Sequence, residues 1–140
     1  MNTMKNITQH LPKATLFFIS LLLLTTSCHK KKPVDYIPGA WGVLTYIESG
    51  KDKTSDFNIT FQGYKITFDA KGNFTEYYRT ILGEVTITGT WTLDNNNTHL
   101  TLVDNNPNST NKIRIYTVLQ LTETVFNVGE SNKEYDLRKQ

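Results

Sequence analysis

Cysteine, methionine and histidine are scarce in this chain of 140 residues, which contains one, two and three of them. The single cysteine, Cys28, excludes an intramolecular disulfide. It also leaves no second thiol for a cysteine-ligated metal centre, and none in the body of the chain for nucleophilic catalysis. A small domain without disulfides depends on a closed hydrophobic core.

Catalytic motifs are also missing. His99 is the only histidine after residue 29, and one histidine alone cannot hold a metal ion. It alternates with Leu100, so we expect it to face solvent. The chain has no Gly-x-Ser-x-Gly, no phosphate-binding glycine loop and no carboxylate pair at a spacing that suggests acid–base chemistry. The sequence therefore predicts a protein that is not an enzyme and needs no cofactor or metal.

No apolar run is long enough to span a bilayer, which takes roughly 20 residues. The longest run, 16–24, follows the basic residues Lys5, His10 and Lys13 and leads into Thr25-Thr26-Ser27. A basic start, a short apolar segment and small residues are typical of a secretory signal. We therefore predict a signal peptide over 1–27, which leaves one small domain.

Cys28 directly follows those small residues, an arrangement that resembles the lipobox of bacterial lipoproteins. The usual lipobox has a leucine three residues before the cysteine, whereas this chain has Thr25 at that position and its leucine, Leu24, one residue earlier. The resemblance implies that Cys28 carries fatty acyl chains such as palmitate, that 28–38 is a lipidated tether, and that the protein is anchored in the bacterial cell envelope, at the outer membrane. The alternatives are an uncleaved N-terminal anchor and a buried free thiol. The residues that follow Cys28, 29–33, are basic and end in a proline, so they disfavour burial of the thiol.

The charge of the chain gives no reason to expect a nucleic-acid partner. Its formal net charge is +2, but residues 33–140 contain 10 basic and 13 acidic side chains. The positive excess thus belongs to the targeting region. Lys30, Lys31 and Lys32 are consistent with a solvated tether or with attraction to anionic lipid.

Alternating apolar residues dominate the rest of the chain and predict strands with one buried face. In 84–93 the apolar residues occupy 85, 87, 91 and 93, so Trp91 is expected to face the core and Thr90 the solvent. Ile113, Ile115, Leu119 and Leu121 share one parity in another such run. Eight strands are predicted in all, at 40–48, 56–68, 73–80, 84–93, 98–103, 112–122, 124–129 and 133–139.

The strand predicted over 56–68 changes parity at Gln62-Gly63. Phe57, Ile59 and Phe61 alternate before this point, and Tyr64, Ile66 and Phe68 after it. A β-bulge would keep both sets on one core, and a tight turn is the competing interpretation.

Short polar connections join the predicted strands. Asp69-Ala70-Lys71-Gly72 is typical of a hairpin, and the asparagine-rich segments 94–97 and 104–108 are typical of loops. Short connections favour antiparallel neighbours, and closing the sheet removes its edges. The sequence thus predicts an all-β fold over 39–140, an eight-stranded antiparallel up-and-down barrel, with a β-sandwich as the second choice.

Three motifs give this region a resemblance to the lipocalin-like domain of small bacterial lipoproteins. They are Gly39-Ala40-Trp41 at the first strand, the hairpin 68–74, and Gly89-Thr90-Trp91-Thr92-Leu93 followed by Leu100-Thr101-Leu102. The resemblance covers roughly 38–139 and implies the fold more than a function. It departs from true lipocalins because no segment remains after the last strand for a helix. Arg138 is either the late arginine that packs on the lipocalin tryptophan or a plain surface residue.

Aromatic side chains are the remaining candidates for a function. They fill the core of the barrel or, in part, line its mouth, where Tyr46, Tyr64 and Tyr116 would hold a small amphiphile. Two functions follow. One is a membrane-anchored protein that binds or carries a small hydrophobic ligand, and the other is a non-enzymatic structural or interaction module that acts through its loops on protein partners, which the sequence does not name.

Overall fold

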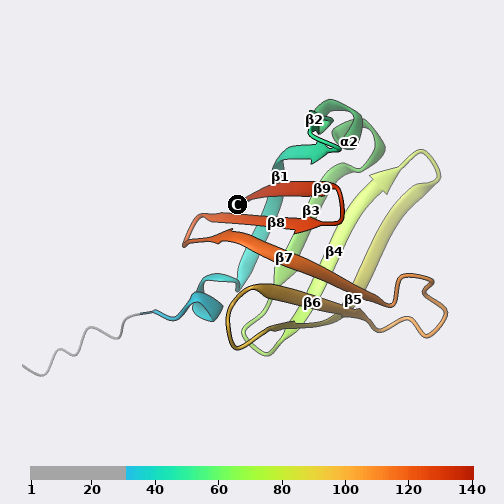
Figure 1. Ribbon diagram of the computed structural model, residues 1–140. Helices are drawn as coiled ribbons and strands as arrows, with labels where there is room; N and C mark the ends of the chain where they lie inside the picture. The colour runs from blue at the N-terminus through green and yellow to red at the C-terminus, as the bar shows by residue number, and fades with distance from the viewer. Residues whose placement is uncertain (1–30) are drawn as a thin grey trace, which may run out of the picture. The chain divides into compact units, whose positions relative to one another are not determined.

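One antiparallel sheet makes up most of residues 31–140, the part of the chain that the computed structural model describes (Figure 1). Two short helices accompany it, η2 (Pro33–Tyr36) and α2 (Thr54–Thr60). The two-residue strand β2 (Lys51–Asp52) pairs antiparallel with residues 47 and 48 at the end of the first long strand. The other strands are β1 (Gly39–Glu48), β3 (Gln62–Phe68), β4 (Asn73–Thr80), β5 (Gly83–Leu93), β6 (His99–Asp104), β7 (Ile113–Leu121), β8 (Val125–Glu130) and β9 (Lys133–Lys139).

The sheet closes on itself. Each long strand pairs with the next along the chain, and β9 pairs back onto β1 from Trp41↔Lys139 to Glu48↔Lys133. Eight strands therefore form a barrel, and β2 is an addition at its rim. Because a single closed sheet is not a sandwich, the predicted eight-stranded antiparallel barrel is confirmed and the second choice is not.

Large buried side chains fill one end of the barrel. Trp41 and Phe126 are fully buried there with their ring centroids 5.5 Å apart, and Phe68 contacts Trp91 at 5.7 Å. The indole Nε1 of Trp41 donates a hydrogen bond to the carbonyl of Ile37 at 2.7 Å, which ties the segment after η2 across this end. We call this end, where β1 begins and β9 finishes, the closed end.

A cation does cover Trp41, but it is not Arg138. The Nζ atom of Lys139 lies 5.1 Å from the centre of the Trp41 ring and donates to the carbonyl of Tyr36 at 3.2 Å. Arg138 instead pairs with Asp136 at 3.0 Å on the outer surface. The surface interpretation of Arg138 is therefore the right one.

The predicted strand 56–68 is wrong in its first half. Residues 54–60 form helix α2, and the strand begins only at Gln62. Phe57 and Phe61 are four residues apart, so they project on the same side of the helical turn, whereas Ile59 is exposed. The irregularity predicted at Gln62-Gly63 lies at the start of β3, where Gly63 takes φ 64° and the register with β4 shifts between Gln62 and Lys65, as in a β-bulge. The backbone N–H of Tyr64 also donates to the carbonyl of Phe61 at 3.2 Å, so a tight turn accompanies the shift.

The buried face predicted for β7 is also wrong. Ile113, Ile115 and Leu119 point outward and remain 62%, 55% and 55% exposed. The alternate residues of β7, among them Arg114 and Tyr116, face the barrel interior. A register shift between Val118 and Gln120 then returns Leu121 to the inside.

The turns agree with their sequence. Gly72 takes φ 87° in the β3–β4 hairpin, where the carboxylate of Asp69 accepts hydrogen bonds from the backbone N–H groups of Lys71 and Asn73, both at 2.8 Å. Trp91 is buried and Thr90 exposed, as predicted. His99 is exposed, as expected, with Nδ1 3.2 Å from the carboxylate of Asp94.

Candidate ligand-binding cavity

The barrel contains a cavity of about 380 Å³ toward the end opposite the closed end. Around this open end lie α2, the β4–β5 and β8–β9 hairpins and the β6–β7 loop, while η2 lies at the other end (Figure 1). The volume falls within the range of about 300–1,000 Å³ that is usual for small-molecule sites. The cavity is therefore large enough to be a binding site.

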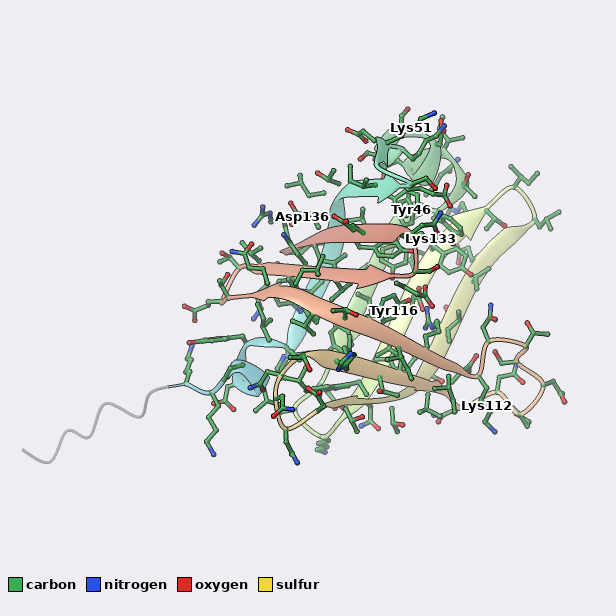
Figure 2. The ribbon with its side chains drawn as sticks, in the orientation of Figure 1. Tyr46, Lys51, Lys112, Tyr116, Lys133 and Asp136 are labelled. Carbon is green, nitrogen blue, oxygen red and sulfur yellow. The ribbon has the colours of Figure 1, made fainter. Side chains whose placement is uncertain are left out.

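The three tyrosines chosen from the sequence come together at this cavity. Tyr46 on β1, Tyr64 on β3 and Tyr116 on β7 all line it, although 70 residues separate the first from the last. Figure 2 shows Tyr46 and Tyr116 on different strands around the same interior. Their role in binding a ligand stays a prediction.

Two further tyrosines join them. Tyr135 on β9 contacts Tyr46 at 5.1 Å and Tyr116 at 6.1 Å between ring centroids, and Tyr78 on β4 stacks on Tyr64 at 6.3 Å. Both line the cavity. Both lie in predicted strands, 73–80 and 133–139, but nothing local distinguished them from core aromatics.

Helix α2 adds an aromatic wall. Phe57 is buried and its ring lies 5.1 Å from that of Tyr46 and 5.4 Å from that of Tyr64, while Phe61 meets Tyr78 at 5.2 Å. The helix thereby places two phenylalanines beside the mouth. Sequence reasoning assigned them to a strand and missed this role.

A buried ion pair crosses the barrel at the cavity. Nη2 of Arg114 on β7 donates to Oε2 of Glu76 on β4 at 2.6 Å, and the two side chains are only 19% and 6% exposed. The guanidinium also lies 5.7 Å from the centre of the Phe74 ring. Burial opposes the charge of Arg114, but the hydrogen bond and negative charge of Glu76 outweigh it and raise the pKa of Arg114. The interior thus contains a charge pair that was not predicted, because the alternation of β7 favoured its apolar face inward.

The tyrosine hydroxyls stay neutral at ordinary pH. Burial raises the pKa of Tyr116 to about 12 and that of Tyr64 well above its usual value of 10.0. Burial also raises the pKa of Tyr135. A neutral hydroxyl donates one hydrogen bond and accepts others. The cavity therefore offers polar contacts without adding net charge.

The rim contributes polar groups from two connections. Ser109, Thr110 and Asn111 of the β6–β7 loop line the mouth, together with Glu130 and Lys133 beside the β8–β9 hairpin. The remaining lining is Asp104 and the apolar residues Ile66, Phe68, Ile87, Leu100, Leu102, Val128 and Leu137.

Other predicted features are not tested by this structure. Cys28 and the predicted signal 1–27 lie outside the described residues. Within 31–140, no cluster of three or more metal-ligating side chains is present. In the same range, no helix has the length and apolarity needed to cross a bilayer.

Comparison with known proteins gives this architecture a family. The family described as the lipocalin-like domain matches residues 37–128. A lipocalin-like protein from Bacteroides uniformis shares 15% identity over 75% of this chain and 99% of its own, with a TM-score of 0.59. An uncharacterized protein from Bacteroides eggerthii shares 17% identity over 74% of this chain and 99% of its own, with a TM-score of 0.57.

No curated protein matches the chain. The two solved structures share too little sequence to indicate more than the fold. The family match covers well over half of the chain. It begins at Ile37, whose carbonyl accepts the hydrogen bond from Trp41, and ends at Val128, which lines the cavity. The chain therefore belongs to the lipocalin-like domain family.

Proposed function

We propose that this protein is a lipid-anchored, non-enzymatic lipoprotein of the bacterial cell envelope that binds or carries a small hydrophobic ligand in its barrel. The observation that carries the proposal is the cavity of about 380 Å³, which is lined by aromatic and aliphatic side chains together with polar and charged ones. Such a pocket is typical of small-molecule binding sites. Tyr46, Tyr64 and Tyr116 supply amphipathic contact surface to the ligand.

The position of the tether supports an accessible mouth. The described chain begins at the closed end, where Nζ of Lys31 pairs with Glu123 of the β7–β8 connection at 2.6 Å. The mouth is at the other end of the barrel. A ligand therefore enters and leaves without displacing the segment through which Cys28 would anchor the domain.

Binding is tested on protein lacking residues 1–28, because residues 31–140 form a compact unit with their own core. Native mass spectrometry should show a co-purified small molecule, or titration with a hydrophobic fluorescent probe should saturate at one site. Tyr64→Phe or Tyr116→Phe should weaken binding by about 1 kcal/mol, the net value of one hydrogen bond. Tyr77→Phe is the matched control, since Tyr77 lies next to Tyr78 on the outer face of β4.

The second candidate is an interaction module, and a specific observation favours it. Ile113, Ile115 and Leu119 form an exposed apolar row on the outside of β7. Exposed apolar patches often mark protein contacts. A clean apo mass without saturable probe binding would contradict the carrier and leave this module as the better proposal.

A further inference from the structure

Glu76 of the ion pair lies deep inside the cavity, and Arg114, the second residue of β7, reaches it from beside the β6–β7 loop. Glu76 pairs in register with Ile66 on β3 and Ile87 on β5, both in the middle of their strands. Its inward neighbours along β4 are Phe74, toward the closed end, and Tyr78, toward the mouth. A ligand that fills the cavity therefore reaches a charged group.

The charges at this depth balance each other. The carboxylate of Glu76 and the guanidinium of Arg114 neutralise one another at 2.6 Å. An anionic ligand group that approaches Arg114 would also meet the charge of Glu76, and a cationic one that approaches Glu76 would also meet Arg114. Breaking the balance leaves a buried charge without compensation, which is strongly unfavourable.

The remaining charged groups of the lining do not change this balance in favour of an anion. They are Asp104, Glu130 and Lys133, with two negative charges and one positive. Asp104 already accepts a hydrogen bond from the backbone N–H of Asn106 at 2.8 Å. An anion thus gains no net attraction from the walls.

Hydrogen-bonding capacity is nonetheless high around the pair. A guanidinium has five N–H donors, and one of those of Arg114 bonds to Glu76. The neutral hydroxyls of Tyr64 and Tyr116 both donate and accept, and both lie close enough to Glu76 and Arg114 for the charges to affect their ionisation. Toward the closed end, Phe68 and Leu100 offer only apolar contact.

We propose that the cavity selects a neutral, ring-containing amphiphile whose hydroxyl or carbonyl group reaches the Glu76–Arg114 pair while its rings lie against the aromatic wall. This inference rests on the proposed function and adds the ligand class. Flat rings suit a wall built from Tyr46, Phe57 and Tyr135, since aromatic pairs prefer offset or edge-to-face contact. A simple hydrocarbon leaves the polar groups unpaired, and a carboxylate meets Glu76.

The test compares three probes of matched ring size, 2-naphthol, 2-methylnaphthalene and 2-naphthoate, titrated at pH 7 into protein lacking residues 1–28. We expect 2-naphthol to bind at least tenfold more tightly than either of the others, a factor that corresponds to about 1.4 kcal/mol. Equal or tighter binding of methylnaphthalene or naphthoate would overturn this inference about the ligand class but not the proposed function. Failure of all three probes to saturate would overturn the proposed function itself.

Two variants link the preference to the pair. Glu76→Leu with Arg114→Met removes both charges, and such apolar replacement of a buried pair is often tolerated. It should abolish the preference for naphthol. The exposed pair Arg79–Glu84, joined at 2.7 Å, is the matched control, and Arg79→Met with Glu84→Leu should leave the preference intact.

A single change should reverse the charge selectivity. Glu76→Gln leaves Arg114 without its counter-charge, so naphthoate should bind at least tenfold more tightly than to the wild type. Unchanged naphthoate affinity in a folded Glu76→Gln protein would contradict the role of Glu76. If this variant does not fold, the Glu76→Leu, Arg114→Met protein still tests the inference through the naphthol preference.

Discussion

The contribution of a side chain to the stability of this barrel depends on which face of its strand it occupies. Trp91 and Thr90 are adjacent on β5, yet the first is buried against Phe68 and the second is exposed. The Nε1 atom of Trp91 also donates to the carbonyl of Asp69 at 3.1 Å. The indole thus packs the core and ties the β3–β4 hairpin to it.

Trp91→Ala should lower the free energy of unfolding by about 3–5 kcal/mol, as large-to-small core substitutions do. Thr90→Ala should cost far less, because its side chain contributes no core contact. Chemical denaturation at constant m-value measures both. Equal midpoints for the two variants would contradict the assignment of faces on β5.

The buried tyrosines predict a loss of stability at alkaline pH. Burial raises the pKa of Tyr116 from 10.0 in the unfolded chain to about 12 in the fold. The folded state then holds a proton that the unfolded state loses, so stability is complete below about pH 10 and declines up to about pH 12.

Tyr116→Phe should make this alkaline loss smaller, as followed by unfolding midpoints between pH 8 and pH 12. Thr90→Ala, which removes an exposed side chain without an ionisable group, serves as the control and should leave the shape of the profile as in the wild type. A Tyr116→Phe profile identical to the wild type would show that Tyr116 ionises equally in both states.

At the scale of elements, α2 is held to the barrel by one buried aromatic ring and by a hydrogen bond from the backbone N–H of Tyr46 to Oγ1 of Thr54 at 2.9 Å. Phe57 contacts Tyr46, Phe61, Tyr64 and Tyr135, all within 6.2 Å between centroids. A helix of seven residues has little stability of its own, so its persistence depends on such tertiary contacts.

Phe57→Ala should therefore release α2 while leaving the strands in place. Hydrogen exchange should show loss of protection for the backbone N–H of Phe61, which bonds to the carbonyl of Phe57 at 2.8 Å. Ile59→Ala is the control on the same helix, since Ile59 is 67% exposed. Retained protection in Phe57→Ala would mean that other contacts hold the helix.

At the scale of the whole molecule, residues 31–38 and the mouth of the cavity lie at opposite ends of the barrel. Residues 31–38 meet the barrel at its closed end, where Lys139 covers Trp41, and the cavity opens at the other. The proposed anchor at Cys28 would be joined to the barrel through this segment. Lipid chains hold a protein at a membrane by burying about 0.8 kcal/mol per CH₂ group, and two or more chains hold it stably.

Acylation of Cys28 is expected from its place after Thr25-Thr26-Ser27. Metabolic labelling with a fatty-acid analogue should mark the full-length protein and not Cys28→Ala, and only the former should fractionate with membranes. Equal labelling of the two proteins would refute the lipoprotein assignment.

The sequence alone determined the features that depend on local pattern. Alternation placed the barrel strands, with Trp91 inward, and the glycine and aspartate of 69–72 marked a hairpin, because side-chain direction and turn conformation follow from neighbours along the chain. Tyr46, Tyr64 and Tyr116 were chosen instead as amphipathic aromatics that could line a barrel mouth, and the structure brings them to one cavity.

Only the tertiary structure decided what required partners from distant strands. Strand β7 turns its polar face to the barrel interior, against its apolar pattern, because Arg114 pairs there with Glu76, 38 residues away in the sequence. Residues 54–60 became a helix because Phe57 and Phe61, four apart, meet aromatics of β1, β3 and β4. The periodicity of the sequence cannot predict such contacts, because their free energy comes from groups that only the closed barrel brings together.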